Sequence, residues 1–287
     1  MKRPAHPLAI TVVLLYAVIS LAPIAWLAIT SVKHRTDIVT LPPRVLPAFE
    51  QDVRPEAPWF RFSFASYERL FAGTDSPLPY LMNSVIIAAV STIASVFLGA
   101  FAAYGFSRFR VPGANDWLFF ILSTRLLPPL AVAVPISFMY RRLGLNDTHF
   151  GLILLYTCFN LSFSTWLMKA FIDEIPAAYE EAALLDGYTR LQVFFRIVLP
   201  QATTGMLATA VFCLITAWNE FAFALTLTSE QAVTMPVRLN AIARQPGADI
   251  WGPLAAGAVF FMIPVVVFSL LMRKHLLRGV TFGAVKG

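Results

Sequence analysis

Two ionisable residues, Arg125 and Glu220, stand inside long apolar stretches of the chain. A charge is costly in an apolar environment, so such a residue is a candidate functional site by default. Arg125 lies close to Pro128, where the missing N–H interrupts helical hydrogen bonding and frees a backbone carbonyl. Glu220 directly follows Trp218 and Asn219. An aromatic face beside such hydrogen-bonding groups can hold the C–H surface and the hydroxyls of a sugar.

The amide side chain of Asn160, in the preceding apolar stretch, can also bind hydroxyl groups. We predict that it forms a substrate cavity together with these residues. Its members are Arg125, Asn160, Trp218, Asn219 and Glu220. The alternative is that Arg125 and Glu220 join helices, pairing with groups of another chain without touching a solute.

Catalytic and metal-binding chemistry is disfavoured. An intramembrane enzyme needs a close acid–base pair or an H-E-x-x-H motif, but the apolar stretches contain no Asp and the four His residues lie near their ends. Cys158 and Cys213 have no His or second Cys at metal-ligand spacing, which favours packing roles. No catalytic residue and no metal site are therefore predicted.

The most informative polar stretch is residues 173–200, DEIPAAYEEAALLDGYTRLQVFFRIVLP. Pro176 is suited to a helix start, and the Ala- and Leu-rich run that follows is a strong helix former. Gly187 can adopt the left-handed backbone that ends a helix, and a second amphipathic turn leads to Pro200. This pattern predicts two short helices joined at a glycine. The alternative is an ordinary amphipathic loop lying on lipid headgroups.

The elements that position these residues are membrane spans. The chain is 58% hydrophobic and 13% charged, whereas soluble domains are about 25% charged. Six apolar stretches are long enough to cross a hydrocarbon core of about 30 Å as helices. They are Leu8–Val32, Leu81–Phe106, Trp117–Tyr140, Gly151–Ile172, Ala202–Thr228 and Leu254–Met272.

The distribution of Lys and Arg predicts that both termini are cytoplasmic. Residues 33–80 then form an extracytoplasmic segment and residues 173–200 a cytoplasmic loop, within a single transmembrane domain of residues 1–287. The net charge of +6 is spread over span ends, as headgroup contacts require, and does not indicate nucleic-acid binding. Within the extracytoplasmic segment, Phe62–Phe71 has the spacing of a short interfacial helix.

The cytoplasmic loop resembles the coupling loop of ABC importer permeases, whose signature is Glu-Ala-Ala, three residues, Gly, nine residues, Ile-x-Leu-Pro. The matching positions are Glu181, Ala182, Ala183, Gly187, Ile197, Leu199 and Pro200. Further stretches are similar to the maltose-type, carbohydrate-uptake branch and to its smaller permease. They are Leu81–Ser84, Ser123–Pro135, Arg141–Thr148, Trp218–Leu225 and Arg278–Gly287.

The resemblance implies an all-α membrane protein with the type I importer permease fold, six transmembrane helices and cytoplasmic termini. It implies a multi-pass protein of a bacterial or archaeal cytoplasmic membrane that imports a sugar, oligosaccharide, sugar alcohol or sugar derivative. Implied partners are a second permease, an ATPase homodimer and an extracytoplasmic substrate-binding protein. The chain has no phosphate-cradling G-x-x-x-x-G-K-[ST] loop, so ATP and Mg²⁺ are expected in the ATPase and no cofactor in this chain.

Two sets of residues are implied to touch the ATPase. The coupling set is Glu181, Ala182, Ala183, Asp186 and Gly187, and the tail set is Val285, Lys286 and Gly287. The alternatives are that Glu181 only keeps the helix soluble and that the tail is a frayed terminus. A permease for a non-carbohydrate solute is the main alternative function. The transported solute and any direct contact with it do not follow from the sequence.

Overall fold

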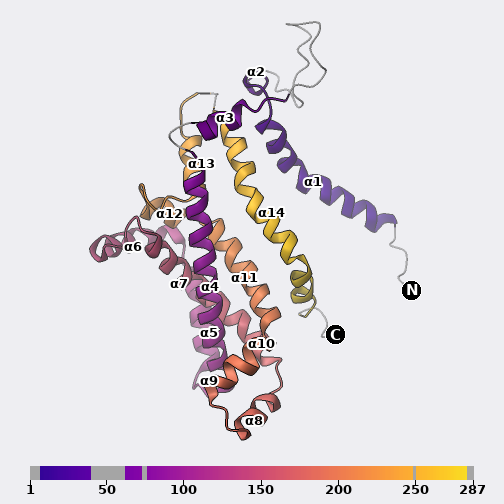
Figure 1. The fold of residues 1–287 in the computed structure, drawn as a ribbon, viewed down its shortest axis with the longest axis vertical. Coiled ribbons are helices and arrows are strands. Elements are labelled where there is room, and N and C mark those ends of the chain that lie inside the picture. The colour runs from indigo at the N-terminus through magenta and orange to yellow at the C-terminus, as the bar shows by residue number, and fades with distance from the viewer. Residues whose placement is uncertain (1–6, 40–61, 73–75, 248–249, 283–287) are drawn as a thin grey trace. The chain divides into compact units, whose positions relative to one another are not determined.

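The computed structural model describes residues 7–39, 62–72, 76–247 and 250–282, and these residues form helices without a strand among them. Among these described residues, four helices are long and apolar enough to cross a membrane (Figure 1). They are α1 (Pro7–Ser31), α4 (Leu78–Arg108), α7 (His149–Asp173) and α14 (Trp251–Phe282). These four confirm the first, second, fourth and sixth predicted spans.

The third and fifth predicted spans are bent rather than straight. The third comprises α5 (Ala114–Ser123), the 3₁₀ turn η2 (Thr124–Leu126) and α6 (Pro129–Leu143), with a bend of 90° at the break. The break falls at Leu127 and Pro128, because the residue before a proline avoids the helical conformation. If each bent pair counts as one span, the described residues contain six.

The fifth span differs more from the predicted Ala202–Thr228. Helix α11 covers Thr203–Trp218 and bends by 75° from the helical turns before it. It ends at Asn219, and the short helix α12 (Ala222–Leu227) follows. This interruption leaves backbone N–H groups at the start of α12 that need hydrogen-bond acceptors.

The chain divides into two compact units. The first unit comprises residues 1–79 and 238–263, and the second comprises residues 80–237 and 264–287. In the first unit, α1 exposes apolar side chains all around, as a helix in lipid does. Helices α2 (Arg35–Val39) and α3 (Ala65–Ala72) follow it, and α3 lies where the short interfacial helix is predicted.

A small core holds the rest of the first unit together. Leu70 of α3 packs with Ile242 of α13 (Met235–Ala243) and Ala256 of α14. Gly252 approaches Ser66 so closely that an added Cβ would lie 2.4 Å from its Oγ atom. A small residue is therefore required at the start of α14.

The second unit is built on the close packing of α4 against α7. Small residues recur every four positions along one face of α4, at Ser91, Ser95, Gly99 and Ala103, and all four are buried. Ser164 of α7 donates a hydrogen bond to the Ser95 carbonyl at 2.8 Å. Small side chains let membrane helices approach closely, and hydroxyl groups satisfy their polar atoms against the neighbouring backbone. The packed pair of α4 and α7 is the frame of the second unit, and the segments at both ends of the unit attach to it.

Candidate functional site

The predicted two-helix protrusion is present between α7 and α11. Its first helix, α8, covers Ala178–Leu185. Gly187 follows with a φ of 88°, the left-handed conformation that an L residue adopts only at a cost. A capping box of Thr189 and Gln192 starts α9 (Arg190–Val193). Figure 1 shows α8 and α9 at one end of the second unit, with α12 towards the other.

The second half of the protrusion enters α11 through a π-helical turn, Phe194–Val198 (η3), and the short α10, Leu199–Gln201. Pro200 lacks the N–H that would continue the α-helical ladder at this point. Phe194 is fully buried and packs against the rings of Tyr104 and Phe101. The turn thus joins the protrusion to the end of α4.

A buried carboxylate joins α8 to the same end of α4. Glu180 is 2% exposed, and its Oε1 atom accepts a hydrogen bond from Arg108 Nε at 2.5 Å. The Tyr104 hydroxyl lies 3.1 Å from Glu180 Oε2. Arg108 also donates to the carbonyls of Ile172 and Ile175, at the end of α7. One ion pair therefore links α8, α4 and α7.

Residues on the opposite face of α8 are free of such contacts within the second unit. Ala183 is buried, whereas Glu181, Ala182, Asp186 and Gly187 are exposed. Leu185 is 89% exposed and Tyr179 is 56% exposed. This face of α8 is therefore accessible to another protein.

Sequence reasoning missed Glu180. It selected the neighbouring Glu181, which matches the Glu-Ala-Ala signature. A usable signal was the basic residue Arg108 at the end of the second span, which lacks an acidic partner in its own helix.

A polar cavity of about 170 Å³ lies within the second unit. It is lined by Arg125, Leu127, Pro129, Tyr156, Phe159, Asn160, Thr216, Ala217, Glu220 and Phe223. The structure thus brings together three of the five residues predicted for a substrate cavity, from η2, α7 and the end of α11. The wall between α7 and α11 is well packed, and Asn160 is only 2% exposed.

Two polar atoms of this cavity have no hydrogen-bond partner. Asn160 donates from Nδ2 to the Cys213 carbonyl at 3.3 Å, while its Oδ1 atom is buried and unpaired. Arg125 donates from Nη2 to Thr216 Oγ1 at 3.2 Å, while Nη1 is buried and unpaired. The guanidinium also lies over the Phe163 ring, 5.0 Å from its centroid.

Glu220, by contrast, has several partners. Its carboxylate accepts hydrogen bonds from the backbone N–H groups of Phe223 and Ala224, at 2.9 and 3.1 Å. The Tyr156 hydroxyl donates to Oε2 at 2.6 Å. Glu220 therefore supplies the acceptors that the interrupted fifth span requires, besides lining the cavity.

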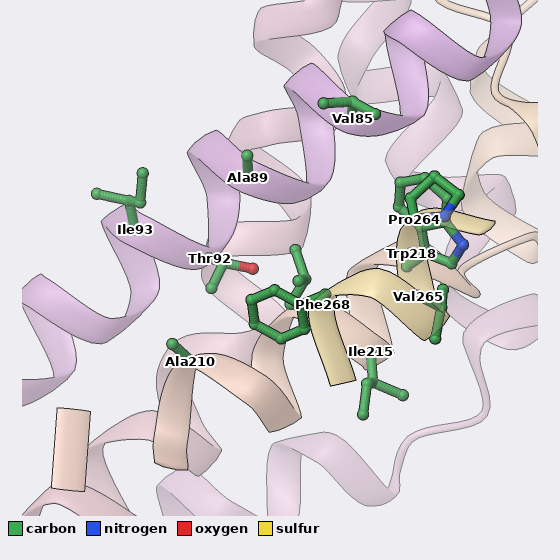
Figure 2. A pocket seen from close by; sticks show the side chains of 11 residues that line it. Val85, Ala89, Thr92, Ile93, Ala210, Ile215, Trp218, Pro264, Val265 and Phe268 are labelled. Carbon is green, nitrogen blue, oxygen red and sulfur yellow. The ribbon is translucent and has the colours of Figure 1, made fainter. Parts of the chain in front are cut away.

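The two remaining predicted residues lie elsewhere. Asn219 is exposed and donates to the Ile215 carbonyl of its own helix at 2.8 Å. Trp218 lines a separate pocket of about 370 Å³ among α4, α11 and α14. Figure 2 shows that this pocket is lined by carbon atoms almost throughout, with the Thr92 hydroxyl among them. Such a lining suits lipid or another apolar helix rather than a sugar.

At the end of the second unit opposite α8, Asp147 holds the loop of residues 229–232 by hydrogen bonds. Its carboxylate accepts hydrogen bonds from the backbone N–H groups of four consecutive residues, Ser229, Glu230, Gln231 and Ala232. Burial alone would raise the pKa of this carboxyl, but the four backbone hydrogen bonds outweigh it and lower the pKa to about 2.

Asn83 of α4 also forms hydrogen bonds with this loop. It donates to the carbonyls of Gln231 and Val233 at 2.9 Å, and its Oδ1 atom lies 2.8 Å from His149 Nε2. Asn83 and Arg108 are 25 residues apart on one helix, which corresponds to about 37 Å along its axis. The two clusters are thus separated by more than the hydrocarbon thickness of a bilayer.

The predicted tail residues Val285, Lys286 and Gly287 lie outside the described residues. The described part of the chain contains no group of three or more His, Cys, Asp and Glu side chains that could hold a metal ion.

Comparison with known proteins identifies the fold. Residues 95–281 match the family described as binding-protein-dependent transport system inner membrane component. A probable ABC transporter permease protein, y4oR of Sinorhizobium fredii, is 34% identical over 94% of this chain and 92% of that relative. The trehalose transport system permease protein SugB of Mycobacterium tuberculosis is 37% identical over 78% of this chain and 82% of its own length.

A solved structure gives the same result for the fold. The crystal structure of a bacterial ABC transporter involved in the import of the acidic polysaccharide alginate contains a similar chain. The TM-score is 0.75 at 20% identity, covering 96% of this chain and 99% of that one.

Proposed function

The chain belongs to the family of inner membrane components of binding-protein-dependent transport systems, and from this premise we propose that it is a permease subunit for carbohydrate import. It is a multi-pass protein of the cytoplasmic membrane and a transport component rather than an enzyme. The relative named as a trehalose permease supports a carbohydrate as the solute. The stretches that resemble the maltose-type branch support the same class.

Coupling to ATP hydrolysis takes place at α8. The exposed face with Glu181, Ala182 and Leu185 docks on a cytoplasmic ATPase, while the opposite face is fixed to α4 and α7 through Glu180. When two ATPase subunits close on ATP, α8 moves as a lever and the spans to which it is fixed tilt with it. The ion pair between Glu180 and Arg108 is the single observation that carries this mechanism, because it connects the docking face to the span frame.

We propose the other components of the transporter from the composition of related importers. A second permease completes the transmembrane pathway, an ATPase homodimer holds ATP and Mg²⁺, and an external binding protein delivers the solute. The loop fixed by Asp147 and Asn83 lies at the end of the second unit far from α8, where such a binding protein would approach. Val285, Lys286 and Gly287 are proposed as a further ATPase contact.

Purification of the tagged chain from its native membrane tests this function. We expect an ATPase and a second permease to co-purify, and ATP hydrolysis to accompany solute uptake. The variants Glu181→Ala and Leu185→Ala should lower ATPase recovery while leaving the amount of membrane-inserted chain unchanged, because both side chains point away from the fold. Thr226→Ala, an exposed change far from α8, is the control. Full ATPase recovery with both variants would contradict the docking role of α8.

A further inference from the structure

Two side chains that line the polar cavity each carry a buried polar atom without a hydrogen-bond partner, one a donor and one an acceptor. The donor is the Nη1 group of Arg125 and the acceptor is the Oδ1 atom of Asn160. The orientation of the amide is fixed, because Nδ2 is the atom that can donate to the Cys213 carbonyl. An unsatisfied buried polar atom costs free energy, so a group that pairs with both atoms is favoured there.

A hydroxyl group is the complement of this pair. Its oxygen accepts from Arg125 and its O–H donates to Asn160, whereas a carboxylate or sulfonate can only accept. An anion would leave Asn160 Oδ1 without a partner. It would also face the carboxylate of Glu220, which lines the same cavity and forms no ion pair within 4 Å among the described residues.

The size of the cavity limits what enters it. At about 170 Å³ it is smaller than the roughly 300–1,000 Å³ of sites that enclose drug-sized ligands. It therefore suits one sugar ring or polyol segment at a time. The rings of Phe159 and Phe223, which pack together at 4.8 Å between centroids, provide an apolar wall for a sugar's C–H face.

We infer that this cavity is a contact site for the transported solute and that it selects a neutral polyhydroxyl compound, a sugar or sugar alcohol, over an acidic sugar. The inference rests on the proposed import function. Arg125 and Asn160 together bind one hydroxyl group, and Glu220 excludes anions.

Uptake in cells lacking the chain's gene tests the solute class. The strain is complemented with the wild-type chain, and uptake of radiolabelled trehalose, maltose and mannitol is compared with that of glucuronate and galacturonate. We expect the wild type to restore uptake of a neutral probe and of neither acid. Restoration of an acidic probe would overturn the inference alone, whereas restoration of no carbohydrate would overturn the proposed function as well.

Substitutions test the contact itself. Asn160→Ala and Arg125→Gln should each lower uptake of the restored neutral probe by about ten- to a hundredfold at normal protein levels. Ser162→Ala, a buried change on the same helix whose hydroxyl bonds only its own backbone, is the matched control and should retain uptake. Unchanged uptake in both cavity variants would mean that the cavity holds water alone, and would overturn the site.

Deoxy analogues of the restored probe separate binding from a structural role. The wild type should discriminate against at least one mono-deoxy analogue, and Asn160→Ala should lose that discrimination, because the acceptor that reads the missing hydroxyl is gone. The binding protein is the same in both strains, so the difference between them isolates the cavity. Equal discrimination by wild type and variant would show that Asn160 only supports the fold.

Discussion

Two carboxylates, Glu180 and Asp147, each fix a loop of the second unit through several hydrogen bonds. Glu180 fixes the two-helix protrusion to α4, and Asp147 fixes the loop after α12. Hydrogen bonds to an ionised carboxylate are stronger than those between neutral groups, so one residue can hold a segment of several residues. Single substitutions at these two positions are therefore expected to act on whole loops.

Replacing Glu180 should be much more damaging than replacing its neighbour. Glu180→Ala leaves Arg108 with an uncompensated, largely buried charge, which costs about 3–5 kcal/mol. Glu181→Ala removes an exposed side chain and should leave stability unchanged within about 0.5 kcal/mol. Thermal unfolding of the purified complex in detergent measures both. Equal unfolding temperatures for the two variants would show that the ion pair does not anchor α8.

The loop held by Asp147 should be insensitive to pH until strong acid. The carboxyl has a pKa of about 2 against an ordinary value of 3.8, so it is ionised in the folded protein across neutral and mildly acidic pH. Because its pKa is lowered by folding, the stability it contributes is present above about pH 4 and is lost as the pH falls towards 2.

Protease sensitivity of residues 229–232 in right-side-out vesicles provides the measurement. The wild-type loop should stay protected between pH 7 and 5, whereas Asp147→Ala should expose it across that whole range. Ser137→Ala, which removes an exposed hydroxyl bonded to its own helix, is the control. A loop that remains protected in Asp147→Ala would show that Asn83 alone is sufficient to hold it.

The helices differ in how each meets its neighbours. The face of α4 with small residues packs against α7, α8 adds to the end of that pair, and α1 has no buried residue in its apolar window. The two bent spans carry the irregular backbone that lines the polar cavity. In a membrane such breaks are tolerated where neighbouring helices and side chains satisfy the freed backbone groups, as Glu220 does for α12.

Gly99 is the critical position of the α4–α7 contact. An added Cβ would lie 2.1 Å from Ser164 Oγ and 3.0 Å from its backbone, so Gly99→Val must push the helices apart. We expect a loss of about 1–3 kcal/mol and a lower unfolding temperature. Gly105→Ala on the same helix meets nothing within 4 Å and should be neutral or slightly stabilising. Similar unfolding temperatures for the two variants would contradict the close packing.

The two-helix protrusion and the loop fixed by Asp147 lie at opposite ends of the second unit. This separation allows one side to receive force from an ATPase and the other to meet a binding protein. It requires that the two ends face opposite sides of the membrane, which the distribution of Lys and Arg predicts. The orientation of the whole chain is therefore the condition on which the proposed mechanism depends.

Cysteine labelling checks this orientation. In a background with Cys158→Ala and Cys213→Ala, a single cysteine is introduced by Leu185→Cys or by Glu230→Cys, both at exposed positions. A membrane-impermeant maleimide should label the Glu230→Cys variant in right-side-out vesicles and the Leu185→Cys variant only in inside-out vesicles. Labelling of Leu185→Cys from the outside would place the protrusion on the wrong side and refute the transport mechanism.

The amino-acid sequence by itself determined the class of the protein, four of the spans and the two-helix protrusion. These follow from local chemistry, since apolar stretches of sufficient length must form helices in lipid and a glycine at position 187 ends a helix. The residues proposed for coupling could be selected because their spacing is confined to one short segment.

Only the tertiary structure decided which way side chains face. Successive residues of an α-helix point about 100° apart, so whether Glu180 or Glu181 is buried depends on how α8 lies against α4 and α7. The same holds for Trp218 and Glu220, which are neighbours in sequence but line different pockets. Arg125 and Asn160 line the same cavity only because a bent span brings η2 against α7, and such packing across distant segments leaves no local pattern in the sequence.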